Sequence, residues 1–325
     1  MPKNKNILVT GGAGFIGCHL VEELIKDNRV TVVDDFSVGS MDNLKEFVNN
    51  PNLKVIKEDI RNQERMIELT KEIDIIYHMA VVCLRVSINN PMIVDEINST
   101  GTLKMLIAAQ KNNVKKFIYI SSSEAYGSAL KAPMDETHPL IPITLYGASK
   151  AAGELYTQSF HLTYGLPTVI VRPFNTYGPK EHFEGASGEV IPKFVIRIMN
   201  NITPVIFGDG EQTRDFTYVK DTVDGIIQAS DCPELIGETV NIARGEEVSI
   251  NRILNIVKSV LNKDIQAEYR EGRPGDVRRH YADINKAKKF FNYQPNTSIE
   301  DGIKKYITWL KTQNIDLTKD KTINW

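Results

Sequence analysis

The chain has 325 residues, of which 42% are hydrophobic and 25% charged, a composition that is ordinary for a globular protein and excludes a disordered chain. Its net charge of −2 supplies no general basic field, so we expect no nucleic-acid partner, and its apolar runs are shorter than the ~20 residues that cross a membrane. Its three cysteines and six histidines lack the spacing of metal ligands, and no signal-like segment precedes the first strand. We therefore expect reduced thiols, no metal site and a cytoplasmic location.

The first predicted element is a short apolar strand, Ile7–Val9, that runs into a glycine-rich turn and a helix. Gly11 allows a tight bend, Gly14 lets the backbone approach a pyrophosphate, and Gly17 lets the helix pack closely on the strand. The unpaired N–H groups at the start of that helix bind an anion without help from charged side chains. This pattern predicts a dinucleotide-binding turn.

The second predicted strand, Arg29–Asp34, supports this interpretation because it ends in an acid 20 residues after Gly14. A carboxylate at that place hydrogen-bonds a free ribose 2′-hydroxyl and repels a 2′-phosphate, so Asp34 predicts NAD rather than NADP. Asp35 is a second candidate for the ribose, and its alternative is a solvated turn residue.

Further strands alternate with helices, which predicts a doubly wound parallel α/β sheet of the Rossmann type. The expected strands are 54–57, 73–78, 116–121 and 168–172, and the expected helices are 64–71, 101–112 and 148–164. Later come a helix at 191–200, a helix and a strand that return to the sheet, and helices at 250–261 and within 284–310. We therefore expect a dinucleotide-binding domain of residues 1–172 with 218–243, and a smaller, sequence-interleaved substrate lobe of residues 173–217 and 244–325.

A phenol and an ammonium group stand four residues apart at Tyr146 and Lys150, which places them on one face of a helix. The cation stabilises the phenolate, and an oxidised nicotinamide lowers the tyrosine pKa further, as a catalytic base requires. By itself this pair is common on helix surfaces, but here it follows a dinucleotide-binding turn. The hydroxyl-rich segment Ser121–Gly127 also follows an apolar strand, so its side chains should emerge where ligands bind to such sheets.

Together these motifs resemble the extended short-chain dehydrogenase/reductase family, and within it the nucleotide-sugar epimerases and dehydratases. The resemblance runs nearly end to end and rests on residues 10–17, 34, 58–61, 78–80, 98, 121–127, 146, 150, 172–178, 208–216 and 273–276. It implies that NAD is the cofactor, that Tyr146 is the base, that Lys150 holds the nicotinamide ribose, and that Ser122 hydrogen-bonds the sugar. The further cofactor contacts that it implies come from Phe15, Ile16, Asp59, Ile60, Ala80 and Asn98.

The resemblance also implies a nucleotide-diphosphate sugar as substrate, with UDP or dTDP favoured. The residues that match the family's substrate ligands are Asn175, Val190, Arg214, Arg273 and Asp276. Of these, Asn175 and Arg214 resemble diphosphate ligands, because a guanidinium offers a fork of N–H groups to such an anion. Arg273 and Asp276 resemble the pair that holds the nucleoside.

Some of these arginines have simpler interpretations. The alternative for Arg214 is an ion pair with Asp209 or Asp215. Arg278 and Arg279 form, with their neighbours, a basic cluster that fits either an anionic ligand or a solvated face.

Members of this family oxidise the sugar C4 to a ketone, and other groups decide the fate of that ketone. Glu124 matches the glutamate with which 4,6-dehydratases take the C5 proton, so an NDP-hexose 4,6-dehydratase is our preferred interpretation, although a solvated loop acid is its alternative. Ser123 stands where several dehydratases carry an aspartic acid that protonates the departing C6 hydroxyl, and serine is a poorer acid. A UDP-glucose-type 4-epimerase, which the later half of the chain resembles, comes second.

Two further interpretations stay open. A UDP-glucuronate decarboxylase would need Arg85 or Arg278 on the substrate carboxylate. A cofactor-sensing protein would bind NAD without turnover, and the intact set of Ser122, Tyr146 and Lys150 argues against it.

The segment Val81–Ser87 is one residue shorter before Pro91 than in the family, so its side chains are not assigned by resemblance. We expect Cys83 to pack in the interior, with a place beside the sugar as its alternative, and His78 to be a structural residue at the end of a strand. The resemblance and the two long helices at 101–112 and 148–164 predict a homodimer with a four-helix interface.

Overall fold

The computed structural model describes residues 1–183, 189–272 and 277–313, with the side chain of Arg85 left out. Its largest element is a seven-stranded sheet with the order β11-β6-β5-β4-β1-β2-β3, in which every neighbouring pair is parallel. The strands are β1 (Asn6–Thr10), β2 (Arg29–Asp34), β3 (Leu53–Lys57), β4 (Ile75–His78), β5 (Lys116–Ile120), β6 (Thr168–Pro173) and β11 (Thr239–Ile242). The predicted doubly wound parallel sheet is confirmed.

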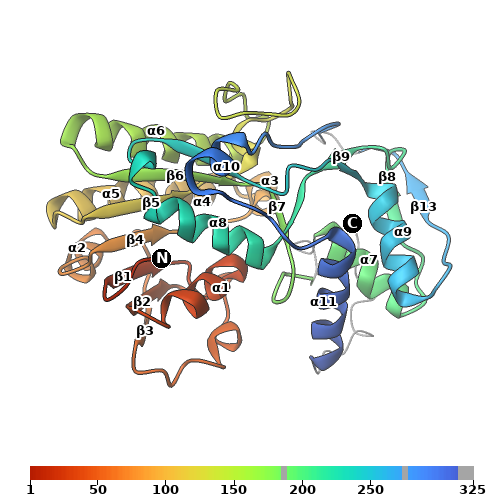
Figure 1. Ribbon diagram of the computed structural model, residues 1–325, viewed down its shortest axis with the longest axis horizontal. Helices are drawn as coiled ribbons and strands as arrows, with labels where there is room; N and C mark the ends of the chain where they lie inside the picture. Colours follow the sequence, from red (N-terminus) through yellow and green to blue (C-terminus); the bar gives the residue numbers. More distant parts are fainter. Residues whose placement is uncertain (184–188, 273–276, 314–325) are drawn as a thin grey trace.

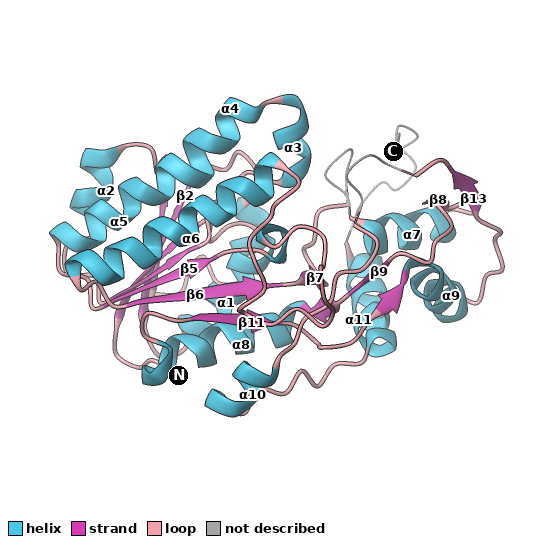
Figure 2. Cartoon of the chain, turned by 90° about the horizontal axis from the view of Figure 1, so that it is seen from above, coloured by secondary structure: helices cyan, strands magenta, loops and turns pink. Residues whose placement is uncertain are grey.

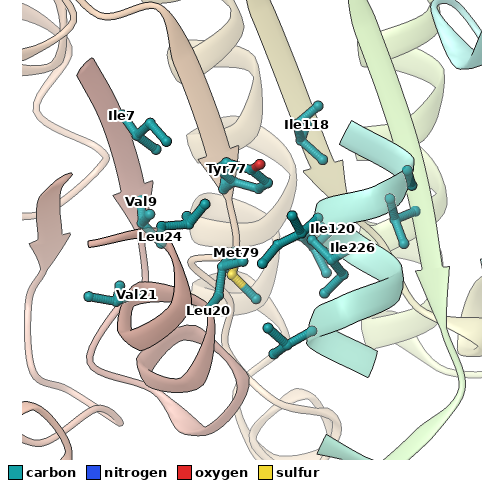
Figure 3. Close-up of a cluster of buried hydrophobic side chains, with 14 of the residues drawn as sticks. Ile7, Val9, Leu20, Val21, Leu24, Tyr77, Met79, Ile118, Ile120 and Ile226 are labelled. Carbon is teal, nitrogen blue, oxygen red and sulfur yellow. The ribbon is translucent and has the colours of Figure 1, made fainter. Parts of the chain in front are cut away.

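Helices cover both faces of this sheet (Figure 2). One face carries α1 (Phe15–Leu24), α8 (Val219–Asp231) and α10 (Asn285–Phe291), and the other carries α2 (Gln63–Leu69), α5 (Thr102–Lys111) and α6 (Leu145–Tyr164). Side chains alternate accordingly along β1, since Ile7 and Val9 join the buried cluster beneath α1 while Leu8 joins the cluster beneath α5. Figure 3 shows Ile7 and Val9 packed with Leu20 and Leu24 of α1.

The strand order reverses beside β1, because β1 is followed in the chain by β2 on one side but pairs with β4 on the other. At such a reversal the connections leave toward opposite faces and open a crevice at the carboxyl ends of the strands. The glycine-rich turn follows β1 directly, so it lies at this crevice.

A second group of elements lies beside the sheet, at the right of Figure 1. Its helices are α7 (Val190–Met199), α9 (Ile250–Leu261) and α11 (Ile299–Thr312), and its short strands pair as β7 (Asn175–Tyr177) with β10 (Phe216–Tyr218), β9 (Thr213–Arg214) with β12 (Val248–Ser249), and β8 (Val205–Phe207) with β13 (Glu268–Arg270). Apolar residues three and four apart on α9, such as Ile250, Ile253 and Val257, pack into one buried cluster with α7 and α11. Phe15 of α1 packs against this cluster, so the two groups of elements meet beside the glycine-rich turn.

Some helical elements were not predicted. They are α3 (Leu84–Asn89), α4 (Pro91–Val94), the π-helical turn η2 (Asp95–Gly101) and the 3₁₀ helices η1 (Met41–Leu44), η3 (Ser123–Ala125) and η5 (Pro233–Leu235). Since α4, η2 and α5 follow one another directly, the helix expected at 101–112 begins about three turns earlier than predicted. No helix among the described residues has both the length and the apolar composition needed to cross a bilayer.

A buried ion pair ties α6 to the sheet. The Arg172 guanidinium, at the end of β6, donates from Nε to Glu154 Oε1 at 2.8 Å and from Nη2 to Oε2 at 2.5 Å, and both side chains are at most 5% exposed. Arg172 also donates to the Tyr126 hydroxyl at 2.7 Å, which in turn donates to Asn241 of β11 at 2.8 Å. Two strands, one helix and the segment after β5 are therefore joined by one buried network.

Removing one partner of this pair should destabilise the protein strongly, because the other charge is left buried without a partner. We expect Glu154→Ala to lower the free energy of unfolding by about 3–5 kcal/mol, measured by urea denaturation. The matched control is Lys304→Ala, which removes an exposed i,i+3 pair with Asp301 on α11 and should leave the denaturation midpoint unchanged. Equal midpoints for the two variants would contradict a structural role for the buried pair.

Candidate active site

A cavity of about 410 Å³ lies at the carboxyl ends of the strands and reaches the start of α7. Most of the residues predicted from the sequence line it, although they come from distant parts of the chain. These are Gly11, Gly14, Phe15, Ile16, Gly17, Asp34, Asp35, Asp59, Ile60, Ala80, Ser122, Glu124, Tyr146, Lys150, Asn175 and Val190. The crevice predicted by the strand order is thus the place where the candidate residues meet.

The glycine-rich turn has the shape that an anion-binding turn requires. Gly11 has a φ of +69°, and a Cβ there would lie 2.8 Å from the backbone of Ala80. A Cβ on Gly17 would lie 2.3 Å from the carbonyl oxygen of Gly11, so α1 packs closely on the turn itself. No side chain caps the start of α1 at Gly14, and its first turn holds no acid. Its free N–H groups are therefore available to a phosphate group.

Asp34 closes the second strand and is only 7% exposed. One carboxylate oxygen accepts from the N–H of Ala13 at 2.9 Å and the other from the N–H of Phe36 at 2.9 Å. Burial raises the pKa of Asp34, and these two N–H groups oppose that shift. Asp34 therefore lines the cavity while it holds the glycine-rich turn in place.

Two further acids that line the cavity, Asp35 and Asp59, accept hydrogen bonds from side chains as well. Asp35 accepts from the N–H and the hydroxyl of Ser37, as a turn residue does, although it also lines the cavity. Asp59 binds the Arg61 guanidinium, with the shortest contact at 2.6 Å, and this contact lowers the pKa of Asp59. Ile60 is 5% exposed and presents an apolar surface beside Asp59.

Tyr146 and Lys150 lie in the first turns of α6, which Thr144 caps by accepting from the N–H of Gly147 at 3.0 Å. Lys150 is 3% exposed, and its ammonium donates to the carbonyl of Ile120 at 2.5 Å. The same ammonium lies 4.5 Å from the ring centre of Tyr119. Burial lowers the pKa of Lys150 to about 7.

The Tyr146 phenol shows the opposite shift. Burial raises the pKa of Tyr146, a hydrogen bond with the Ser122 side chain partly offsets it, and the nearby Glu124, Cys83 and Glu189 raise it further. The lowering that we expected from Lys150 is therefore not achieved by the protein groups around Tyr146. A phenolate at neutral pH needs additional positive charge in the cavity.

A close approach at Gly147 brings the catalytic candidates together. A Cβ on Gly147 would lie 2.4 Å from the carbonyl oxygen of Glu124, so only glycine lets the start of α6 sit against the turn after β5. In that turn, the Ser122 hydroxyl accepts from the N–H of Glu124 at 3.2 Å. Ser122, Glu124 and Tyr146 consequently line one wall of the cavity.

Two of the residues predicted for catalysis or cofactor binding, Ser123 and Asn98, do not line the cavity. Ser123 is 4% exposed and lies behind the wall, where its carbonyl contacts His280 Nε2 at 3.2 Å, so the catalytic role expected for its hydroxyl is not supported. Asn98 is 1% exposed and uses its amide for the backbone N–H and carbonyl of Val82, at 2.8 and 3.0 Å. Its amide therefore holds the backbone at Val82, and the cofactor contact expected of Asn98 stays a prediction.

Some of the residues predicted to bind the substrate line the cavity, and others do not. Asn175 and Val190 line the cavity, but Arg214 does not, and its guanidinium donates to the carbonyls of Thr213 and Val277 at 2.8 and 2.6 Å. Arg273 and Asp276 lie outside the described residues.

The basic cluster is largely a paired surface. Arg278 and Arg279 form exposed ion pairs with Asp209 and Glu247, and Arg270 forms one with Glu268. Of the two interpretations of this cluster, the solvated face is the one that the structure supports.

Sequence reasoning missed several residues that line the cavity. Cys83, expected to pack in the interior, directly precedes α3 and lines the cavity instead. His182 and Glu189 line it as well, and so does Ser121, as expected for the segment Ser121–Gly127. Ser121 carried a signal, because it directly follows the last strand residue, whereas His182 and Glu189 lie in a segment without periodicity. His78 is structural as expected, since its two ring nitrogens contact the hydroxyls of Thr10 and Thr102 at 2.8 and 2.9 Å.

Comparison with known proteins agrees with this geometry. Residues 8–306 match the family model described as GDP-mannose 4,6 dehydratase. A putative UDP-glucose 4-epimerase of Methanocaldococcus jannaschii is 36% identical over 95% of this chain and 99% of its own length.

Two solved structures are also similar. A UDP-N-acetylglucosamine 4-epimerase from Methanobrevibacter ruminantium M1, in complex with UDP-N-acetylmuramic acid, superposes with a TM-score of 0.91 at 38% identity and covers 96% of this chain and 100% of its own. A dTDP-glucose 4,6-dehydratase from Streptomyces venezuelae with NAD bound superposes with a TM-score of 0.89 at 30% identity and covers 94% and 97%. The chain belongs to the GDP-mannose 4,6-dehydratase family of nucleotide-sugar epimerases and dehydratases.

Proposed function

We propose that the chain binds NAD and a nucleotide-diphosphate sugar and oxidises the sugar C4 to a ketone. The glycine-rich turn and the start of α1 hold the pyrophosphate of NAD, and Asp34 accepts a hydrogen bond from its adenosine ribose. Asp59 and Ile60, which follow β3, lie against the adenine, and Lys150 is bound to the end of β5 on the other side of β1. Bound NAD supplies a hydride acceptor and, when oxidised, a positive charge.

Tyr146 takes the proton of the C4 hydroxyl in this proposal. Ser122, which shares a hydrogen bond with Tyr146, orients the sugar oxygen. The positive charge of oxidised NAD counters the pKa-raising effects of burial and of the acids around Tyr146. Asn175 and Val190, on the opposite side of the cavity, are the described residues that we assign to the nucleotide-sugar.

We propose further that the reaction is an NDP-hexose 4,6-dehydration, and one observation carries this choice. The carboxylate of Glu124 lies in the cavity close enough to Tyr146 to raise the pKa of its phenol. A C4 ketone acidifies the C5 proton, and Glu124 removes that proton and passes it to the C6 hydroxyl, which leaves as water. The hydride taken from C4 then goes to C6, a proton is added at C5 in exchange for the one that Tyr146 took from the C4 hydroxyl, and the product is a 4-keto-6-deoxy sugar.

A 4-epimerase is the second candidate, and two observations favour it. Ser123, the residue expected to protonate the departing hydroxyl, is buried and does not line the cavity. The similar proteins from Methanocaldococcus jannaschii and Methanobrevibacter ruminantium are both named as 4-epimerases.

The remaining alternatives have less support. For a decarboxylase, Lys150 is the one lysine or arginine among the described residues that line the cavity, and Arg278 is paired on the surface. For a cofactor sensor without turnover, the shared hydrogen bond of Ser122 and Tyr146 would serve no purpose.

The choice of cofactor can be tested at Asp34. We expect Asp34→Asn to weaken NAD binding by about 10- to 100-fold, since it replaces a charge-assisted hydrogen bond. It should strengthen NADP binding, because the repulsion of a 2′-phosphate is lost. Calorimetric titration of both nucleotides measures the two effects. Asp27→Asn, at an exposed acid that does not line the cavity, is the control and should leave both affinities unchanged. An Asp34 variant that weakens both nucleotides equally would show that Asp34 acts only on the fold of the turn.

The reaction can be identified by proton NMR of mixtures with UDP-, dTDP-, GDP- and CDP-sugars. A new C6 methyl signal indicates dehydration, exchange of gluco and galacto forms indicates epimerisation, and carbon loss from UDP-glucuronate indicates decarboxylation. We expect the methyl signal, and we expect Tyr146→Phe and Glu124→Gln each to slow its appearance by about 10²- to 10⁴-fold.

The variants Glu124→Gln and Tyr146→Phe distinguish dehydration, epimerisation and cofactor binding without turnover. If the wild-type protein epimerises its sugar and Glu124→Gln leaves that rate unchanged, dehydration is the wrong assignment. NAD binding without turnover of any of these sugars, together with a cellular effect that survives Tyr146→Phe, would reject the enzyme altogether.

We also propose a homodimer through α5 and α6. Both helices lie side by side on one face of the sheet (Figure 2) and expose large apolar side chains, including Ile107 at 37%, Leu155 at 56% and Leu162 at 75%. Leu155 and Leu162 are seven residues apart and so face the same way. Exposed apolar side chains that gather on one face are typical of protein interfaces.

Sedimentation velocity at micromolar concentration tests this interface. We expect a dimer for the wild type and a monomer for the double variant Leu155→Asp/Leu162→Asp, because each substitution would bury a carboxylate between the subunits. Leu130→Asp is the control, since Leu130 is 71% exposed but lies outside α5 and α6. A wild-type monomer would reject the proposal.

A further inference from the structure

Ser121 is a buried residue at the cavity whose side chain has no hydrogen-bond partner among the described residues. It directly follows β5 and is 4% exposed, and it lines the cavity beside Ile120 and Lys150. Its backbone N–H donates to the carbonyl of Val171 at 2.8 Å. Its hydroxyl oxygen, however, is fully buried and makes no hydrogen bond.

An orphaned hydroxyl of this kind costs stability. A polar group removed from water without a new partner costs about 1–3 kcal/mol, and most buried groups are therefore paired. Among the described residues that line the cavity, this feature is shared only by the side-chain oxygen of Asn175. A hydroxyl that lacks a hydrogen-bond partner, on a residue that lines a ligand cavity, has the chemistry of a ligand-binding group.

The other serines of the same segment are already engaged. The Ser122 hydroxyl accepts from the N–H of Glu124 and shares a hydrogen bond with Tyr146. Ser123 lies behind the cavity wall. Ser121 is thus the member of the triplet that can offer both a donor and an acceptor to a bound molecule.

The sheet order indicates which part of a ligand Ser121 meets. Asp34 ends β2 and Asp59 follows β3, so both lie on one side of β1. Ser121 lies on the other side of β1, at the end of β5. Because the pyrophosphate of a dinucleotide sits at the turn after β1, adenosine on the β2 and β3 side requires the nicotinamide riboside to extend toward β4 and β5.

We propose that the Ser121 hydroxyl hydrogen-bonds the nicotinamide riboside half of NAD. This inference rests on the proposed function and adds a cofactor ligand to it. That half of NAD offers two kinds of partner, the ribose hydroxyls and the carboxamide of the ring. Lys150 is anchored to Ile120, the residue before Ser121, so the two side chains approach the same half of the cofactor.

Calorimetric titration of Ser121→Ala with NAD, ADP-ribose and ADP tests the proposal. We expect NAD to bind about 3- to 12-fold more weakly, which corresponds to one neutral hydrogen bond, and ADP to bind within twofold of the wild type. Weaker ADP-ribose binding would assign the contact to the ribose, and unchanged ADP-ribose binding would assign it to the carboxamide.

Thermal unfolding without cofactor supplies a second readout. Because Ser121→Ala removes a hydroxyl that bonds nothing in the protein, the unfolding temperature should stay the same or rise. Ser123→Ala is the matched control, a buried serine behind the wall, and should leave the affinity for NAD relative to ADP unchanged.

The outcomes separate this inference from the function on which it rests. A wild-type protein that binds no NAD rejects the proposed function and the inference together. A wild-type protein that binds NAD, with Ser121→Ala binding it equally well or losing NAD and ADP affinity in equal measure, rejects the Ser121 contact alone.

Discussion

The position of α6 on the sheet is the constraint on which the site depends, because this helix carries both Tyr146 and Lys150. The buried pair of Glu154 and Arg172 holds the helix from the side of β6. A Cβ on Gly153 would lie 2.1 Å from the Tyr119 hydroxyl, so the helix also approaches β5 as closely as a bare backbone allows. Lys150, one turn before Glu154, is thereby brought within hydrogen-bonding distance of β5. The groups that anchor the helix are thus neighbours of the groups proposed to react.

The sequence predicted the parts of the site that depend on short-range patterns. The three glycines, the acid at the end of β2 and the spacing of Tyr146 and Lys150 are local features, and their residues meet in the cavity. The sequence did not reveal the contacts that a side chain makes with a distant segment. Asn98 is bound to the backbone of Val82, and Arg214 to the carbonyl of Val277. A local pattern does not contain such contacts, because they form only when the chain has folded.

Burial shifts the pKa values of Tyr146 and Lys150 in opposite directions. The same dry surroundings raise the pKa of Tyr146 and lower that of Lys150 to about 7, since each group is driven toward its neutral form. Around neutral pH the lysine charge is therefore sensitive to the charge of any ligand that enters the cavity. Positive charge from oxidised NAD acts against the effect of Glu124 and Glu189 on the phenol. The protein groups around Tyr146 therefore oppose ionisation of its phenol until positive charge enters the cavity.

The position of Glu124 helps to distinguish dehydration from epimerisation, whereas family membership is compatible with both reactions. A sugar that reaches Tyr146 also meets this carboxylate, because Gly147 presses the start of α6 against the turn that holds it. A 4-epimerase has no use for a base there, and a carboxylate next to the acidified C5 proton of a 4-keto sugar opens a path to elimination. Either the protein uses that path, or the bound sugar is turned so that C5 faces away from Glu124. The orientation of the sugar ring between Glu124 and Tyr146 is therefore what separates dehydration from epimerisation in this cavity.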